Sequence, residues 1–344
     1  VIWAMIPLYT ASISSMFFDS FRFLRKFRAR IFLNRLSKFN AELLVVAIPV
    51  LIAISPISSI QHFNREPTIF RLTSNLITPE IIQELSVKDD QNFNGRIAFM
   101  GPELDYRSFI QDRIPMLNDY SHNLSPLAYR FQREFFWDGR FEQRRNSFKF
   151  GATNLQLYAM LGVKYLVAQQ PDVSNVNTFG ELESSEFKEK SIQKNHEIVE
   201  LRQPNLGNYS PTNVTVVANL ESAYKELKLL DLNQNIVLFS DPKMNLKPAQ
   251  ESKMTVINGD IRVIAESAGD SVLVLPFEFS SCIKFEEKSE KSNFIRAELA
   301  NGLLTAVFFS KNLDLTISYR LGLFENQDCR LKDLELYRSI TEGF

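Results

Sequence analysis

Histidine and cysteine are scarce in this chain of 344 residues, which contains three of the former and two of the latter. His62, His122 and His196 are far apart in the sequence, and Cys282 and Cys329 belong to no CxxC or Cys/His pattern. Zinc sites are built from closely spaced cysteines and histidines. We therefore predict no metal site in this chain.

Motifs for catalysis and phosphate binding are also missing. The chain has 12 glycines, and none of them forms a P-loop, a GxGxxG fingerprint or a GxSxG nucleophile elbow. No Ser/His/Asp arrangement is recognisable either. The sequence assigns no catalytic residue and no cofactor to this chain, and it leaves open whether the chain is part of an enzyme.

A basic stripe of the kind that binds nucleic acid is absent as well. The formal net charge is −1, and the one dense basic block, residues 19–42, has seven Lys or Arg and two acidic residues. The rest of the chain is mildly acidic, with its charges spread out. Nucleic-acid-binding domains are strongly basic on one face, so we exclude nucleic acid as a partner.

Two long stretches, residues 1–18 and 43–64, carry no Lys, Arg, Asp or Glu. A transmembrane helix needs roughly 20 mostly apolar residues, and a proline such as Pro49 is tolerated inside one. The pattern predicts two transmembrane helices. One alternative is a signal peptide, although its basic residues precede its apolar core rather than follow it. The other is a soluble protein in which a basic amphipathic helix lies between buried core helices.

The basic block between the two runs predicts their orientation. Lys and Arg near the ends of membrane spans stay in the cytoplasm, so we expect a cytoplasmic loop at 19–42. Everything after about residue 60 is then extracytoplasmic, on a bacterial inner membrane, and the lipid bilayer is an expected partner. Because Val1 opens inside an apolar run without an initiator Met, we expect it to be an internal residue of a longer protein.

The remaining chain divides into two regions. Residues 61–245 alternate strand-like and helix-like segments, which indicates an α/β region; these segments are 96–101, 154–161, 163–168, 197–203, 213–219, 222–232 and 235–240. Residues 246–344 contain Asn258-Gly259 and Asn301-Gly302, each between strand-like runs. Asn-Gly accepts the positive φ of a type I′ hairpin turn, so we expect antiparallel strands here.

The predicted fold class is therefore a membrane protein in three parts. Residues 1–60 form two transmembrane helices joined by a basic cytoplasmic loop, and residues 61–245 form an extracytoplasmic α/β region. Residues 246–344 form a C-terminal antiparallel β-sandwich. Outside the cytoplasm Cys282 and Cys329 can oxidise, and the sequence leaves open whether they form a disulfide or are two separate buried thiols.

One segment, residues 118–141, is rich in aromatic and Arg residues. Aromatic faces stack on sugars, polar side chains bond their hydroxyls, and Arg pairs hold lipid phosphates. The alternative is that Phe131, Phe135 and Phe136 are core residues and the Arg residues form a solvated or headgroup-facing rim. The candidate substrate-binding residues are Asp119, Tyr120, His122, Tyr129, Arg130, Arg133, Trp137, Asp138 and Arg140.

Several strings along residues 60–344 carry a family resemblance. They are LYAMLGVKYLVAQ at 157–169, the strand, turn and helix at 197–231, SVLVLPFEFSSCIKF at 271–285, and the stretch at 294–322. Their order resembles the C-terminal part of YfhO-like bacterial multi-pass proteins of the GT-C glycosyltransferase superfamily. The resemblance implies transfer of a sugar from a polyprenyl-phosphate donor to a cell-envelope glycan. It also implies a catalytic acid in an earlier loop, outside this chain.

The expected function is thus the C-terminal, non-catalytic portion of an integral-membrane glycosyltransferase. The alternative is a membrane-anchored extracytoplasmic module that binds a glycan or a protein and has no enzymatic activity. An acidic loop after an upstream first span would distinguish the enzyme from the module. A transporter or receptor fragment is a third hypothesis, and it would place charged or glycine-broken positions inside the spans.

Overall fold

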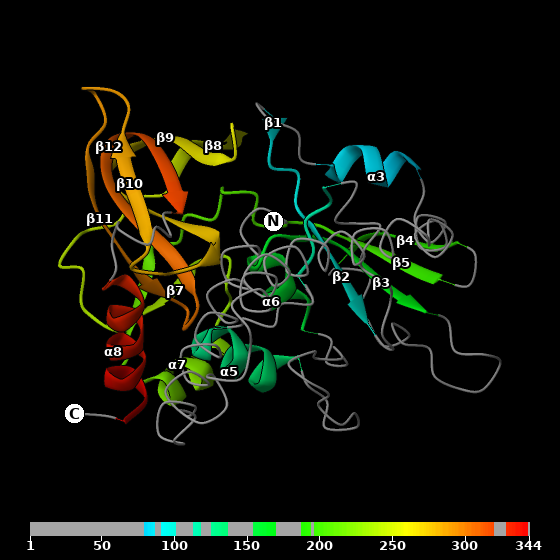
Figure 1. Cartoon of the computed structure of the whole chain (residues 1–344), viewed down its shortest axis with the longest axis horizontal. Helices are drawn as coiled ribbons and strands as arrows, with labels where there is room; N and C mark the ends of the chain where they lie inside the picture. The colour runs from blue at the N-terminus through cyan, green and yellow to red at the C-terminus, as the bar shows by residue number, and fades with distance from the viewer. Residues whose placement is uncertain are drawn as a thin grey trace, which may run out of the picture. The chain divides into compact units, whose positions relative to one another are not determined.

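The computed structural model describes residues 79–86, 91–100, 113–117, 125–136, 154–169, 187–193, 196–319 and 328–342. All of them belong to one compact unit that extends over Thr68–Phe344. The described residues of this unit form two β-sheets, one of four strands and one of eight (Figure 1).

The smaller sheet has the strand order β2-β3-β5-β4. Its strands are β2 (Arg96–Met100), β3 (Val163–Gln169), β4 (Phe187–Gln193) and β5 (His196–Leu201). β2 and β3 run parallel, because a long crossover that includes two of the described helices separates them, and β3, β5 and β4 are antiparallel. The sheet is therefore mixed.

Helices cover both faces of this sheet. α3 (Pro79–Leu85) packs on one face, where Leu85 joins a buried cluster with alternate strand residues such as Ile97 and Phe99. α5 (Pro126–Phe135) and α6 (Leu155–Met160) pack into the core on the other face, with Ala98 and Met100. This alternation follows from the two-residue period of a strand.

The starts of α5 and α6 are set by local capping. The Ser125 hydroxyl accepts a hydrogen bond from the Ala128 amide at 3.0 Å, and a proline occupies the first turn of α5. The Asn154 side chain accepts from the Leu157 amide at 3.1 Å in the same way. Each cap satisfies a backbone donor that the first helical turn leaves unpaired.

The larger sheet has the strand order β1-β8-β9-β12-β11-β7-β6, and β10 pairs with β12 in addition. Its strands are β1 (Gln91–Asn92), β6 (Asn213–Val216), β7 (Asn235–Leu238), β8 (Ala249–Ile257), β9 (Asp260–Glu278), β10 (Ile283–Glu287), β11 (Phe294–Ala300) and β12 (Leu304–Tyr319). β6 and β7 are parallel because α7 (Leu220–Leu227) connects them. α8 (Cys329–Glu342) follows the sheet.

Both predicted Asn-Gly hairpins are confirmed. Asn258 and Gly259 have φ of 51° and 85° and form a two-residue connection, since Ile257 faces Asp260 across the β8–β9 ladder. Asn301 and Gly302 have φ of 51° and 67°. Their connection between β11 and β12 is three residues long, because Ala300 pairs with Leu304.

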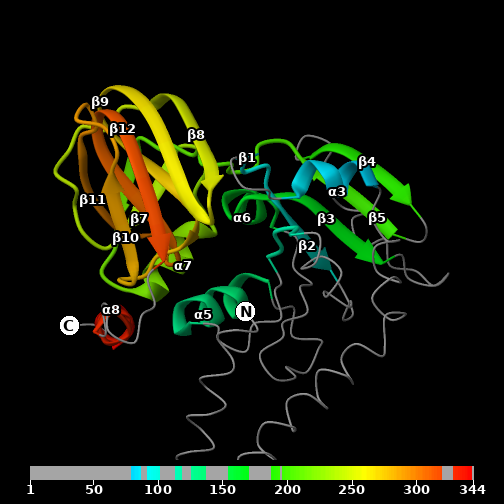
Figure 2. The same cartoon turned by 45° about the horizontal axis from the view of Figure 1, so that its top comes forward.

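β9 and β12 are long strands that stay paired from Leu304 to Ile317 of β12. The ladder is interrupted between Ser310 and Asn312, and Lys311 between them has φ of 64°. Opposite this single residue β9 has three, Ser267–Gly269, because Asp270 pairs with Ser310 and Glu266 pairs with Asn312. Extra residues of this kind bend a strand and increase its twist. Figure 2 shows these strands curling around an interior, which is filled by a buried cluster that includes Val263, Leu275 and Phe309.

The predicted fold class, with N-terminal transmembrane helices, an α/β region and a β-sandwich, is wrong. The described chain is mostly β-sheet, and the longest of its described helices, α8, has 14 residues. Among the described residues, no helix has the length and apolar character needed to cross a bilayer. The charge-free runs at 1–18 and 43–64 lie outside the described residues.

The long strands β9 and β12 explain why the structure differs from the predicted sandwich. A sandwich needs two separate sheets, whereas β9 and β12 continue through the bend and keep both halves in one hydrogen-bonded ladder. β7 then joins this sheet where Leu238 pairs with Ala300, and it brings β6 with it. The large sheet therefore includes strands on both sides of the boundary expected between residues 245 and 246.

Of the buried clusters among the described residues, one is shared by the two sheets. The buried cluster around α5 contains residues of the small sheet, of α7 and of the large sheet. Within this cluster the rings of Phe131 and Phe135 on α5 meet the ring of Tyr224 on α7 edge-on, with centroid distances of 5.9 and 5.2 Å. Aromatic pairs with this geometry contribute about 0.5–1.5 kcal/mol beyond the area they bury.

Candidate functional site

The described part of the chain contains a polar pocket of about 560 Å³. Its wall comes from α6, from the loop at 202–210 after β5, from the turn at 232–233 and from the start of β8. We call it the amide pocket after the amide and guanidinium side chains in this wall, which are Gln156, Arg202, Gln203, Asn205, Asn208 and Asn233. The segments that supply them are far apart in the sequence, so tertiary folding creates the pocket.

Asn205 forms the floor of the amide pocket. It is 3% exposed, and its side-chain amide donates to the carbonyl oxygens of Met160 at 3.0 Å and Val274 at 2.8 Å. Its side-chain oxygen accepts from the amide of Gly207 at 3.0 Å. Its backbone amide donates to Ala159 at 2.8 Å. Its side chain and its backbone amide are engaged, and these hydrogen bonds hold the loop between α6 and β9.

Gly207 allows the loop to take this path. It has φ of 90°, a conformation that side chains rarely adopt. A Cβ at this position would also lie 2.7 Å from the Cβ of Met254 on β8. Both conditions require glycine here, and they fix the direction in which the following residues line the pocket.

The rim of the amide pocket consists of exposed side chains. Gln156, Gln203 and Asn233 are exposed, and their side chains make no hydrogen bond within the described part of the chain. A neighbouring pocket of about 410 Å³ shares these three residues and Arg202. The rim therefore presents side-chain amides to two adjoining pockets.

The described lining of the amide pocket offers hydrogen-bonding groups and few candidates for acid–base chemistry. No Asp, Glu, His, Lys or Cys is among the described residues that line either pocket. These residue types and Tyr supply nearly all general acids and bases. The lining includes Tyr209, but its hydroxyl donates to the carbonyl of Asn235, and burial raises its pKa. Arg202 also lines the pocket, where its guanidinium can only donate hydrogen bonds; its Nε donates to the Phe187 carbonyl at 2.9 Å.

Only part of the predicted aromatic and Arg segment is described, and that part lies on α5. Tyr129 is partly buried against the core, whereas Arg130 and Arg133 are exposed. None of these three lines either pocket. The other predicted residues lie outside the described residues; they are Asp119, Tyr120, His122, Trp137, Asp138 and Arg140.

In the described part of this segment the Phe residues lie in the core and the Arg residues lie at the surface, as the alternative interpretation expects. Phe131 and Phe136 are 0% exposed and Phe135 is 6% exposed, so all three are core residues. The Arg side chains lie on the opposite, solvated face of the helix. Sugar binding by the whole segment stays a prediction.

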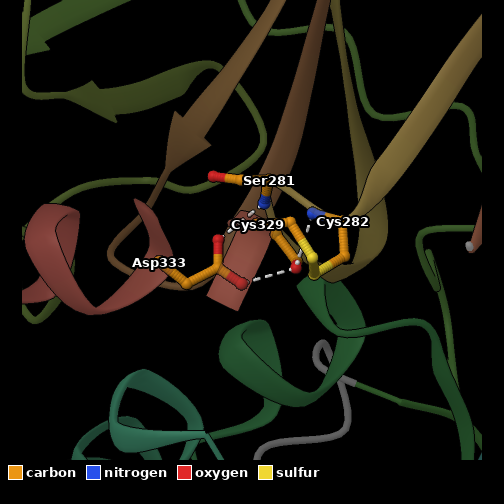
Figure 3. Close-up of a disulfide and its surroundings, with 5 residues drawn as sticks. Ser281, Cys282, Cys329 and Asp333 are labelled. Carbon is orange, nitrogen blue, oxygen red and sulfur yellow. Dashed lines mark hydrogen bonds between the residues drawn. A yellow bond between two sulfur atoms is a disulfide. The ribbon is translucent and has the colours of Figure 1, made fainter. Parts of the chain in front are cut away.

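A disulfide joins Cys282, just before β10, to Cys329, the first residue of α8. The two Cα atoms are 4.9 Å apart, and 47 positions separate the residues in the sequence. Figure 3 shows Asp333 of α8 beside this bond. Its carboxylate accepts from the Ser280 hydroxyl at 2.7 Å and from the Ser281 amide at 2.6 Å. The covalent bond and these hydrogen bonds hold α8 against the end of β9.

Glu278, the last residue of β9, lies close to this junction. Burial raises the pKa of its carboxyl, and the charge of Asp333 raises it further. A hydrogen bond from Ser125, at the start of α5, and the charge of Arg330 oppose this rise. The junction therefore holds a carboxyl group that burial makes costly to ionise.

A second group of titratable side chains lies on the small sheet and is structural. Glu84 of α3 forms an ion pair with Lys164 and accepts a hydrogen bond at 2.8 Å from the hydroxyl of Tyr165. Burial alone would raise the pKa of Glu84, but these two hydrogen bonds lower it. Both partners belong to β3, so the contacts anchor α3 to the sheet. No group of three or more metal-binding side chains occurs among the described residues.

Comparison with protein-family models, curated proteins and solved structures finds no match to this chain. The resemblance to the YfhO-like group, and the glycosyltransferase activity it implies, therefore stay predictions. The candidate site is defined by its geometry and chemistry alone.

One part of the amide pocket has a local signal in the sequence. Residues 203–213 contain one Gln and three Asn along with Pro and Gly, a composition that indicates a turn. Side-chain amides at such density also indicate hydrogen-bonding capacity. Gln156 and Asn233 carry no comparable signal, because nothing in their local sequence shows that they face the same space.

Proposed function

We propose that this chain is a non-catalytic module that binds a glycan outside the cytoplasm. The observation that carries this proposal is the amide pocket, whose rim presents Gln156, Gln203 and Asn233 without hydrogen-bond partners in the described part of the chain. The absence of acidic, basic-amine, imidazole and thiol side chains among the described lining residues supports binding without catalysis.

The chemistry of side-chain amides favours a polyhydroxylated ligand. Each amide offers an acceptor oxygen and two donor hydrogens, and each sugar hydroxyl both donates and accepts. Binding pockets for ordinary small molecules are mostly apolar with a few polar groups. A wall in which three side-chain amides, those of Gln156, Gln203 and Asn233, are available to a ligand matches a sugar better, and the guanidinium of Arg202 extends the range to sugars that carry an acidic group.

The disulfide supports the proposed compartment. Disulfides persist in oxidising environments and are rare in the cytosol. Cys282 and Cys329 are bonded in this chain, so the module is suited to a compartment outside the cytoplasm. An envelope glycan is the proposed ligand in that compartment, and a polyprenyl-phosphate sugar and the lipid bilayer stay predicted partners of a larger assembly.

The test is a binding experiment with the full chain and an array of neutral and acidic oligosaccharides. The double variant Gln203→Ala/Asn233→Ala removes two rim amides without touching the buried Asn205. Loss of two hydrogen bonds at about 1 kcal/mol each lowers affinity by about tenfold or more. The matched control is Gln250→Ala, an exposed amide on β8 that does not line either pocket.

The expected result is that wild type and the Gln250→Ala control bind the same oligosaccharides and the double variant binds them weakly. Thermal unfolding of all three proteins shows whether the fold is retained. If no oligosaccharide on the array binds, or if the double variant binds as well as wild type, the proposal is wrong.

A further inference from the structure

The chain contains two Asn-Gly pairs in opposite environments. Asn258-Gly259 lies at the exposed tip of the β8–β9 hairpin, and Asn301-Gly302 lies in the buried connection between β11 and β12. We propose that Asn258 is a site of spontaneous deamidation and that the fold protects Asn301 from the same reaction.

The reaction needs only the chain and water. The backbone nitrogen of the glycine, after losing its proton to hydroxide, attacks the side-chain Cγ of the asparagine. A nitrogen–carbon bond forms, the bond from Cγ to Nδ2 breaks, and ammonia leaves. Water then opens the resulting cyclic imide at either of its two carbonyl groups, which yields aspartate or isoaspartate. No oxidant, reductant or cofactor takes part.

Asn258 is open to this attack. Both Asn258 and Gly259 are exposed, and among the described residues no other part of the chain comes within 4 Å of the position that a Cβ on Gly259 would occupy. A glycine after the asparagine adds no side chain that would hinder the approach of its nitrogen to Cγ. The tip of a hairpin is also where local fluctuations need the least disruption of packing.

Asn301 is closed to the same attack. It is 0% exposed, its side-chain oxygen accepts from the Val237 amide at 2.8 Å, and its side-chain nitrogen lies 3.1 Å from the sulfur of Met160. A Cβ on the following Gly302 would lie 2.7 Å from the ring of Tyr224. Cγ of Asn301 is therefore held in place, and ring closure needs this part of the core to open first.

The product at position 258 changes the hairpin locally. Aspartate adds a negative charge two residues before Asp260, and isoaspartate adds an atom to the backbone inside a two-residue turn. β1 pairs with β8 at Val256 and Thr255, immediately beside this turn. We therefore expect deamidation to weaken the pairing of the short β1 strand while the centre of the large sheet stays intact.

The experiment is peptide mapping by mass spectrometry after incubation of the full chain at mildly alkaline pH. One sample is native, and a second is unfolded in urea with a thiol reductant. In the native sample we expect conversion at Asn258, with Asn301 reacting more than about tenfold slower because it must await opening of the core. In the unfolded sample both sites convert at comparable rates, which shows that their sequences are equally reactive.

The control variant Asn258→Gln requires a larger ring for the same attack, so conversion at position 258 should stop while Asn301 behaves as in wild type. Three outcomes would overturn the proposal. They are equal rates at both sites in the native protein, no conversion of native Asn258 in a sample whose unfolded counterpart converts, and no conversion in either sample.

Discussion

The side chain of Asn205 donates a hydrogen bond to the backbone carbonyl of Val274, at 2.8 Å. Asn205 belongs to the loop after β5 of the small sheet, and Val274 lies in β9 of the large sheet. Both residues are buried. One amide therefore joins the two sheets at the floor of the amide pocket.

Replacing Asn205 by Ala should destabilise the protein. The substitution leaves the buried carbonyls of Met160 and Val274 without their donor, and an unsatisfied buried polar group costs about 1–3 kcal/mol. We expect the free energy of unfolding in urea to fall by about that amount. The control Asn233→Ala, at the exposed rim, should change it by less than about 0.5 kcal/mol. Equal effects of the two substitutions would contradict the role given to Asn205.

Removing the disulfide should make α8 open more often while the sheets stay folded. In the double variant Cys282→Ala/Cys329→Ala the closed loop is opened, and loss of a native disulfide of this kind costs about 2–4 kcal/mol. Hydrogen exchange should become faster in α8, whereas β12 should keep its protection. If exchange in α8 is unchanged, the hydrogen bonds of Asp333 and the apolar contacts of the helix suffice to hold it.

The Arg262–Asp314 pair should make stability fall in acid. The two side chains form a two-pronged contact across β9 and β12, with both nitrogen–oxygen distances at 2.8 Å. The hydrogen bonds from Arg262 lower the pKa of Asp314 below its ordinary value. A lowered folded-state pKa stabilises the protein above the unfolded value of about 3.9, and this contribution is lost as pH falls through the folded-state pKa.

The substitution Asp314→Asn tests this pair. Because Arg262 is partly exposed, we expect a loss of no more than about 1 kcal/mol at neutral pH. The difference from wild type should shrink as the pH falls below the folded-state pKa. Unfolding curves in urea at a series of pH values measure it, and a difference that stays constant down to strong acid would refute the assignment.

Glu278 should have the opposite effect on the pH dependence. Burial raises its pKa in the folded state, so the folded protein binds this proton more tightly than the unfolded chain does. Stability contributed by the protonated carboxyl is present at low pH and is lost as pH rises from the unfolded value of about 4.3 through the folded-state pKa.

The substitution Glu278→Gln removes this titration. We expect the variant to be more stable than wild type at neutral pH and similar to it in acid, as measured by urea unfolding at both pH values. Glu266→Gln, at an exposed position on the same strand, is the control and should change little. A variant that is less stable than wild type at neutral pH would show that the charged carboxylate is needed at the junction.

The hairpins and strands of the C-terminal region were predictable from short stretches of sequence. Asn-Gly at 258–259 and 301–302 marks both connections, because few residue pairs accept two successive positive φ angles. The alternation around Val263 and Ala265 likewise marks the buried face of β9. These features depend on residues within a few positions of one another.

The amide pocket was not predictable in this way. Gln156 lies on α6, Gln203 follows β5 and Asn233 follows α7, and no local pattern indicates that they share a rim. The aromatic and Arg segment is predicted as a binding site because suitable residue types are contiguous in it. Its described Phe residues are core and its described Arg residues are solvated, so local density of suitable residue types did not identify the pocket.

The sequence by itself determined the turns, the helix caps at Ser125 and Asn154, and the two-residue alternation of the strands, because each depends on backbone conformation and hydrogen bonds between near neighbours. Only the tertiary structure decided that β6 and β7 join the large sheet, that β9 and β12 stay in one bent ladder, and that Cys282 meets Cys329. Those pairings depend on which distant apolar faces bury one another in a common core, and a stretch of sequence carries no local record of its distant partners.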